Sequence, residues 1–201
     1  KKLLSMASPT TPDFSGGVFV SFGSVTTDAM GQEFRDLYNS WPEDRPLTIQ
    51  SGWFDPPPPP SEKNIRVIGA APHQLCFPKA SVVIHHGGAG TTTSAFFAGV
   101  PQIVVPHFAD QTFWAKTVKR TGCGLKVHRR GWGRKLYAAV RQVEADPRFA
   151  ENAKRFVRKF TDSHSAARAL EAIEAIHIGW ESGVQLPGQE LDAAAARAAD
   201  L

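Results

Sequence analysis

The sequence predicts an α/β fold: a doubly wound parallel sheet of about six strands, followed by C-terminal helices. Its strand-like segments are short, apolar and rich in β-branched residues throughout. Segments with helical spacing of apolar residues separate several of them, and the connections are short. Continuous apolar strands are typical of a parallel sheet covered by helices on both faces.

Apolar runs predict strands over residues 17–22, 47–50, 65–68, 81–85, 102–105 and 124–127. Helical spacing predicts helices over 28–41, 91–98 and 110–121, the first capped by Thr27 or Asp28. Prolines occupy every position from 56 to 60, which excludes a helix or central strand and predicts a stiff loop. From Arg134 onward the pattern is helical.

The chain divides into three parts by composition. Residues 1–16 mix Ser, Pro and Thr without periodicity and predict a linker. Residues 17–178 are expected to form one α/β domain, and 179–201 an alanine-rich C-terminal tail that is partly helical. Because the chain begins with Lys1, we expect it to be a piece of a longer protein.

The net charge of +4 is too small for a dedicated nucleic-acid-binding domain, so no nucleic-acid partner is expected. Basic residues cluster over 119–135 and 154–159, where they are either solvated helix faces or a contact for an anionic membrane or partner. Cys76 and Cys123 lack the spacing of disulfide or zinc sites and predict free buried thiols. Without a signal peptide or membrane-spanning stretch, the predicted location is cytoplasmic, with peripheral membrane contact left open.

The segment HHGGAGTTT, residues 85–93, follows a predicted strand and opens a predicted helix. Its small residues allow a ligand to approach main-chain amides, which at a helix N-terminus favour an anion. Gly88, Ala89, Gly90 and Thr91 are therefore expected to bind a diphosphate, with hydroxyls of Thr91 and Thr92 as further donors. His86 can donate an imidazole N–H to a phosphate oxygen. The alternative is a structural glycine turn without a ligand.

Two known phosphate motifs do not fit this segment. The dinucleotide fingerprint would need a glycine where Thr93 stands, and the lysine of a phosphate-binding loop is missing.

Two further positions follow predicted strands, where ligands of such sheets bind. Ser24 comes after Gly23 at the end of the first strand, which is expected to lie beside the fourth, so its hydroxyl can reach the same phosphates. Asp110 and Gln111 follow the fifth strand, and a carboxylate beside a carboxamide suits the hydroxyls of a hexose. The alternative for Asp110 is a helix N-cap.

Four motifs together resemble one family: Pro72-His73, HHGGAGTT at 85–92, GVPQ at 99–102 and FADQTFW at 108–114. They are similar to the C-terminal domain of GT-B glycosyltransferases, above all sterol glucosyltransferases and bacterial natural-product glycosyltransferases. The resemblance implies that residues 17–178 are the Rossmann-like, nucleotide-sugar-binding half of a GT-B fold.

The resemblance also implies a donor and the residues that hold it. UDP-glucose is the expected donor substrate, with no cofactor and no metal. His86 and residues 88–91 would hold the diphosphate with help from Ser24, Asp110 and Gln111 would hold the sugar, and His73 would lie near the base. Related plant enzymes have Trp, Gln and Glu at the positions where this chain has Ala70, His73 and Ser94. The donor nucleotide can therefore carry either uracil or another base.

The implied reaction is transfer of a hexose, with inversion, to a hydroxyl of a small lipophilic acceptor such as a sterol. The catalytic base of this family lies in the N-terminal acceptor-binding domain, so this chain is expected to lack it and to need that domain in cis or in trans. The alternatives are a stand-alone nucleotide-sugar-binding subunit, a sugar-nucleotide epimerase and a non-catalytic scaffold.

Overall fold

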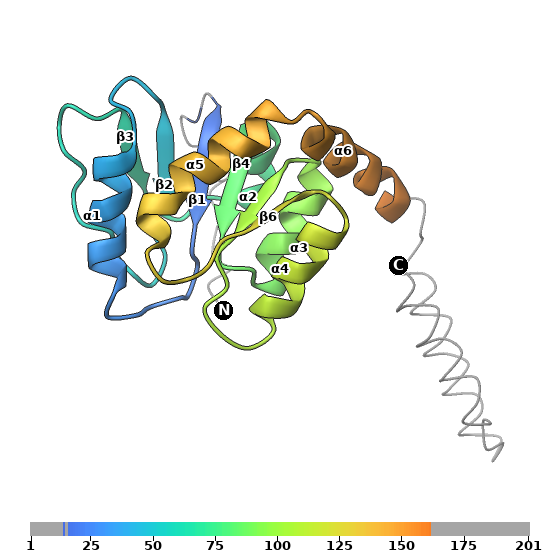
Figure 1. Ribbon diagram of the computed structural model, residues 1–201, viewed down its shortest axis with the longest axis horizontal. Coiled ribbons are helices and arrows are strands. Elements are labelled where there is room, and N and C mark those ends of the chain that lie inside the picture. The colour runs from blue at the N-terminus through green and yellow to red at the C-terminus, as the bar shows by residue number, and fades with distance from the viewer. Residues whose placement is uncertain (1–13, 15, 162–201) are drawn as a thin grey trace, which may run out of the picture. The chain divides into compact units, whose positions relative to one another are not determined.

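The computed structural model describes Phe14 and residues 16–161. This part of the chain contains one parallel sheet of six strands in the order β3-β2-β1-β4-β5-β6 (Figure 1). The strands are β1 (Gly17–Ser21), β2 (Leu47–Gln50), β3 (Ile65–Ile68), β4 (Ala80–His85), β5 (Gln102–Val104) and β6 (Gly124–Lys126). Each neighbouring pair runs parallel, which confirms the predicted sheet.

The helices include the three that the sequence predicts over 28–121, with ends within two residues of the prediction, and a short one over 73–76 that it does not predict. They are α1 (Met30–Ser40), α2 (His73–Cys76), α3 (Ala89–Ala98), α4 (Gln111–Arg120), α5 (Trp132–Ala145) and α6 (Arg148–Thr161), with a 3-10 turn, η1 (Phe77–Lys79). The predicted side-chain cap of α1 is wrong: the N-cap is Ala29, and Thr27 contributes its main-chain carbonyl to the amide of Met30. The predicted helical segment beyond 161, and the tail, lie outside the described residues.

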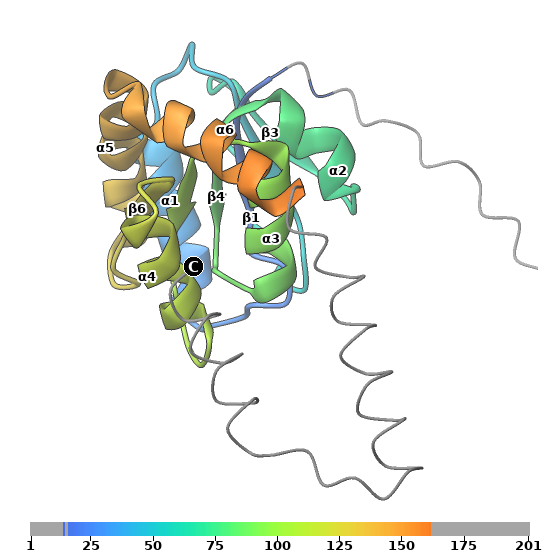
Figure 2. The same ribbon diagram turned by 90° about the vertical axis from the view of Figure 1, so that its right-hand side faces the viewer.

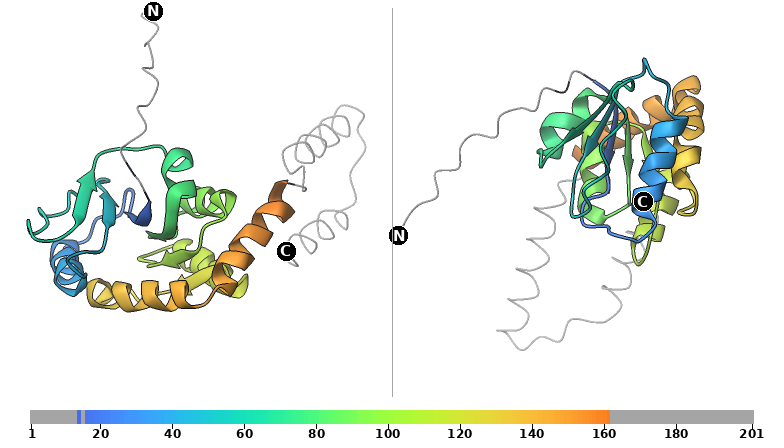
Figure 3. Two further views of the ribbon diagram at one scale, coloured as in Figure 1. Left: turned by 90° about the horizontal axis from the view of Figure 1, so that it is seen from above. Right: turned by 90° about the vertical axis from the view of Figure 1, so that its left-hand side faces the viewer.

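The strands are covered on both sides. Figure 2 shows α1 and α5 on one side of the sheet and α2 and α3 on the other, and Figure 3 shows the same layers from above. Val18 and Val20 belong to the core shared with α1 and α5, whereas Phe19 between them packs against Phe77 and Phe14 on the opposite face. Phe14 is buried there although it falls within the predicted linker.

The order of the strands brings three loops to one edge of the sheet. Ser21 at the end of β1 pairs with His85 at the end of β4, which in turn pairs with Val104 at the end of β5. Since parallel strands end at the same edge, the segments after β1, β4 and β5 lie together at the point where the connections diverge. Ligands of doubly wound sheets bind at this position.

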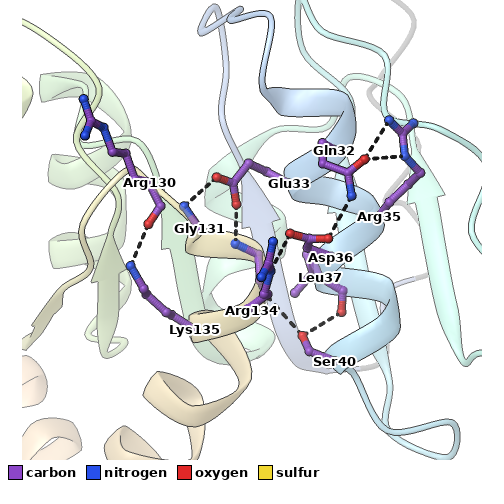
Figure 4. A network of polar contacts seen from close by, with 11 residues as sticks. Gln32, Glu33, Arg35, Asp36, Leu37, Ser40, Arg130, Gly131, Arg134 and Lys135 are labelled. Carbon is purple, nitrogen blue, oxygen red and sulfur yellow. Dashed lines mark hydrogen bonds and ion pairs between the residues drawn. The ribbon is translucent and has the colours of Figure 1, made fainter.

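A carboxylate of α1 holds the N-terminus of α5 (Figure 4). Glu33 accepts hydrogen bonds from the amides of Gly131, at 2.6 Å, and Gly133, at 2.8 Å. The two helices approach so closely that a Cβ built on Gly133 would lie 2.0 Å from the Glu33 carbonyl oxygen. This contact, which we call the Glu33 clamp, fixes the connection between β6 and α5.

Candidate functional site

The imidazole of His86 lies between two glycine turns. A Cβ built on Gly23, in the turn after β1, would lie 3.1 Å from its Cε1, and one on Gly88, at the start of α3, 2.4 Å from its Nε2. Gly23 also has a φ of 56°, which glycine adopts without strain. The ring therefore joins the loops after β1 and β4, as the predicted proximity of the two strands requires.

His86 is 7% exposed, and its Nδ1 has no hydrogen-bond partner within the described part of the chain. Burial lowers the pKa of His86, while the Ser21 carbonyl and the Asp110 charge act in the opposite direction. The imidazole is consequently neutral near pH 7 and carries one N–H donor.

The N-terminus of α3 is free of side-chain caps. Gly88 is the N-cap in an extended conformation, and no side chain of the described chain caps the helix. The first amides of a helix have no partner within it. Space is open around Gly90, where an added Cβ would meet nothing within 4 Å. Main-chain N–H groups beside His86 are thus placed where an anion could approach them.

The two threonines of this helix behave differently. Thr92 is fully buried, and its hydroxyl donates to the Gly88 carbonyl at 2.9 Å. The expectation that Thr92 offers a hydroxyl to a ligand is therefore wrong, because the hydroxyl satisfies the first turn of its own helix. Thr91 is only partly buried.

His85 shapes the turn from inside the protein. Its Nδ1 accepts the amide hydrogen of Gly87 at 3.0 Å, so its Nε2 carries the proton and donates to Oε1 of Gln102 at 2.9 Å. Complete burial lowers the pKa of His85 to about 3. His85 is therefore a neutral residue that fixes the backbone just before the exposed amides of α3. The sequence pattern did not assign it this role.

Ser24 and His73 lie at the same edge in different settings. Ser24 is exposed, next to Gly23. His73 is half-buried, stacks on Phe77 with ring centroids 4.3 Å apart, and its Nε2 lies 3.0 Å from Oε1 of Gln50. Burial lowers the pKa of His73. Nε2 of His73 is thus engaged within the protein, by Gln50 and, at 3.4 Å, by Oγ of Ser21.

Asp110 and Gln111 begin α4, in the loop after β5. Asp110 is exposed and occupies the N-cap position of α4, as the alternative predicted, although its side chain makes no capping hydrogen bond. Gln111 is 5% exposed, and its Oε1 accepts the amide hydrogens of His107 and Phe108 at 2.8 and 3.2 Å. Its carboxamide oxygen is therefore occupied by its own loop, which leaves Nε2 as the group that can donate to a ligand.

Other features of the described residues bear on the class of site. Both cysteines are buried and free, as predicted. Within residues 14 and 16–161, no three His, Cys, Asp or Glu side chains are grouped to hold a metal ion. No helix in this range has the length and apolar character needed to cross a bilayer.

Comparison with known families gives a match over more than half of the chain. The model of the family described as erythromycin biosynthesis protein CIII-like, C-terminal domain, matches residues 60–176. A sterol 3-beta-glucosyltransferase of Debaryomyces hansenii is 26% identical over 184 residues, which cover 86% of this chain and 12% of that protein.

Solved structures share the fold. The glycotransferase of kitacinnamycin superimposes with a TM-score of 0.69 at 24% identity, over 87% of this chain and 46% of that one. A spinosyn rhamnosyltransferase complexed with thymidine diphosphate gives a TM-score of 0.61 at 22% identity, over 82% and 46% of the two chains. The chain thus spans just under half of each solved protein and a much smaller share of the sterol 3-beta-glucosyltransferase.

Proposed function

The chain belongs to the erythromycin biosynthesis protein CIII-like C-terminal domain family of glycosyltransferases, and on this premise we propose that it is a donor-binding half. The donor is a nucleoside-diphosphate hexose, with UDP-glucose as the first candidate. The acceptor is a hydroxyl of a lipophilic molecule such as a sterol, in line with the name of the Debaryomyces hansenii relative. The acceptor-binding domain is supplied in cis or in trans.

One observation carries the proposal: a neutral imidazole, His86, lies between the turns at Gly23 and Gly88, beside the uncapped start of α3. Main-chain amides at a helix N-terminus attract negative charge. An imidazole N–H adds a directed donor from a second loop. A diphosphate presents oxygens at the spacing and charge that such a set of donors can bind together.

The proposed chemistry is a direct displacement at the anomeric carbon. The acceptor oxygen forms a bond to that carbon as the bond to the diphosphate oxygen breaks, which inverts the configuration. The negative charge that develops on the departing diphosphate is stabilised by the α3 amides and His86. Asp110 and Nε2 of Gln111 orient the hexose through its hydroxyls.

The proton of the acceptor hydroxyl needs a base within hydrogen-bond reach. His107 is not assigned this role, because its side chain is buried, with 8% of its surface exposed. His164 lies outside the described residues. We assign the base to the acceptor-binding domain, so the isolated chain binds donor without transferring the sugar.

The proposal also covers the nucleobase of the donor and the location of the enzyme in the cell. The complex of the spinosyn rhamnosyltransferase supports a pyrimidine nucleoside diphosphate as ligand. A cytoplasmic enzyme with a lipophilic acceptor works at a membrane surface, where exposed cations such as Lys119 and Lys126 can face anionic lipid.

The test is thermal unfolding of the 201-residue chain with UDP, thymidine diphosphate or inorganic pyrophosphate. A ligand of the native state at a hundred times its Kd adds about 2.7 kcal/mol to the free energy of unfolding. We expect a rise in Tm with at least one nucleoside diphosphate and a tenfold or greater loss of its affinity, roughly 1.4 kcal/mol, in His86→Ala. The matched control is His128→Ala, an exposed histidine. Absence of any shift at millimolar nucleotide would exclude donor binding.

A further inference from the structure

The loop between β5 and α4, residues 105–110, contains a strained turn. Ala109 has a φ of 49°, in the left-handed region, and the amide of Gln111 donates to the Phe108 carbonyl at 3.3 Å. An L-residue in this conformation costs roughly 1–2 kcal/mol. Contacts around the turn must therefore hold it, and with it the direction in which Asp110 points.

The first contact comes from within the loop. The Gln111 side-chain oxygen accepts the amide hydrogens of both His107 and Phe108, as described above. This closes the loop on itself but does not fix it relative to the sheet.

The second contact comes from the next connection in the sheet. Arg129 donates from Nη1 to the main-chain carbonyl of His107 at 3.1 Å. The backbone on each side of Arg129 is anchored, since the amide of Val127 donates to the Val104 carbonyl at 2.9 Å and Gly131 is held by the Glu33 clamp. Arg129 is thus an exposed side chain on an anchored backbone segment, and it contacts the loop that carries Asp110.

The electrostatics of the loop agree with this geometry. Burial is the main cause that lowers the pKa of His107, the positive charge of Arg129 lowers it further, and the negative charge of Glu33 raises it. The direction of the Arg129 contribution agrees with the position of its guanidinium beside the His107 carbonyl.

We propose that Arg129 is a positioning residue for the sugar end of the donor: it holds the 105–110 loop so that Asp110 and Nε2 of Gln111 face the hexose. This inference rests on the proposed function. Arg129 acts through the His107 carbonyl and touches neither the sugar nor the diphosphate, so its loss affects one end of the donor and spares the other.

The experiment compares Arg129→Ala with Arg130→Ala in the 201-residue chain. Arg130 is also exposed, and the hydrogen bonds described for it are made by its main chain. Calorimetric titration measures the Kd of UDP and of UDP-glucose. In Arg129→Ala we expect the Kd of UDP-glucose to rise about tenfold and that of UDP to stay unchanged. Arg129→Lys restores part of the affinity, and Arg130→Ala matches the wild type for both ligands.

A second measurement needs no ligand. The amides of His107 and Phe108 are hydrogen-bonded, so hydrogen exchange of this loop reports its order. We expect faster exchange in Arg129→Ala and wild-type exchange in Arg130→Ala. Unchanged exchange, or an equal loss of UDP and UDP-glucose affinity, overturns the positioning role. Failure of the wild-type chain to bind either nucleotide overturns the proposed function instead, with the exchange result still deciding whether Arg129 orders the loop.

Discussion

Gly88 and His86 are packed so closely that a Cβ on Gly88 would lie 2.4 Å from the imidazole Nε2. Real Cβ atoms do not approach other atoms to this distance, so Gly88→Ala must displace the ring. The backbone at Gly88, with φ −64° and ψ 144°, suits alanine. The substitution therefore acts on His86 without straining the main chain.

For Gly88→Ala we expect a loss of about 1–3 kcal/mol in stability, the usual cost of overpacking. We also expect UDP affinity to fall at least about tenfold, because the imidazole leaves its place beside the α3 amides. Chemical denaturation and calorimetric titration measure the two quantities. Unaltered UDP binding would show that His86 can move without consequence and would remove it from the site.

Gly90→Ala provides a contrasting test on the same turn. Nothing of the described protein lies within 4 Å of an added Cβ, and alanine is the better helix former, so stability should rise by about 0.5 kcal/mol. If a diphosphate approaches these amides, the same methyl group intrudes on it and weakens UDP binding. Gly31→Ala in α1, where neighbouring atoms leave ordinary room, is the control: it should stabilise the protein and leave UDP affinity unchanged.

The buried, neutral imidazole of His85 predicts a specific dependence of the free energy of unfolding on pH. The pKa is about 3 in the folded chain and 6.5 ordinarily, so between these values the unfolded state binds a proton that the folded state does not. The contribution of neutral His85 is complete above pH 6.5 and declines as pH falls towards 3. Each such group gives a slope of about 1.4 kcal/mol per pH unit at most.

Denaturation of the wild type and His85→Gln at several pH values measures this slope. The variant should be less stable at pH 7, because Gly87 and Gln102 lose a partner, and its stability should fall less steeply below pH 6.5. His73, His86 and His107 have lowered pKa values as well and keep a residual slope in both proteins. Parallel curves would contradict the assignment of a buried neutral imidazole at 85.

The Glu33 clamp predicts unequal effects from two neighbouring carboxylates of α1. Glu33→Gln removes the charge that receives two amide hydrogens, and we expect a loss of about 2 kcal/mol in the free energy of unfolding. Asp36→Asn breaks an ion pair with Arg134 that lies at the surface, and we expect only a small change. Equal effects in urea denaturation would argue against a structural role for the buried contact.

The sheet and the glycine turn could be predicted because both depend on local sequence. Unbroken apolar runs indicated buried parallel strands, and the adjacency of β1 and β4 follows from the usual order of such sheets. The helix α2 and turn η1 are too short for periodicity to detect, and the cap of α1 depends on main-chain geometry rather than on residue type.

The detailed chemistry of the site depends on partners distant in sequence. The proton position of His85 is set by Gln102 on the adjacent strand, and the loop that carries Asp110 is held by Arg129 from the following connection. Thr92 illustrates the same limit at short range, since only the folded helix shows its hydroxyl bonded to the Gly88 carbonyl. Residue type indicated what each side chain can donate, and the fold decided which groups are already engaged.

The Glu33 clamp joins amides that lie 98 and 100 residues further along the chain. During synthesis on a ribosome, α1 therefore emerges long before the segment that covers it. Until Gly133 has left the exit tunnel, the apolar face of α1, which includes Phe34 and Leu37, has no α5 to pack against. Nascent chains of this protein should consequently remain sensitive to protease, and bind chaperones, until the whole sheet and the start of α5 have been translated.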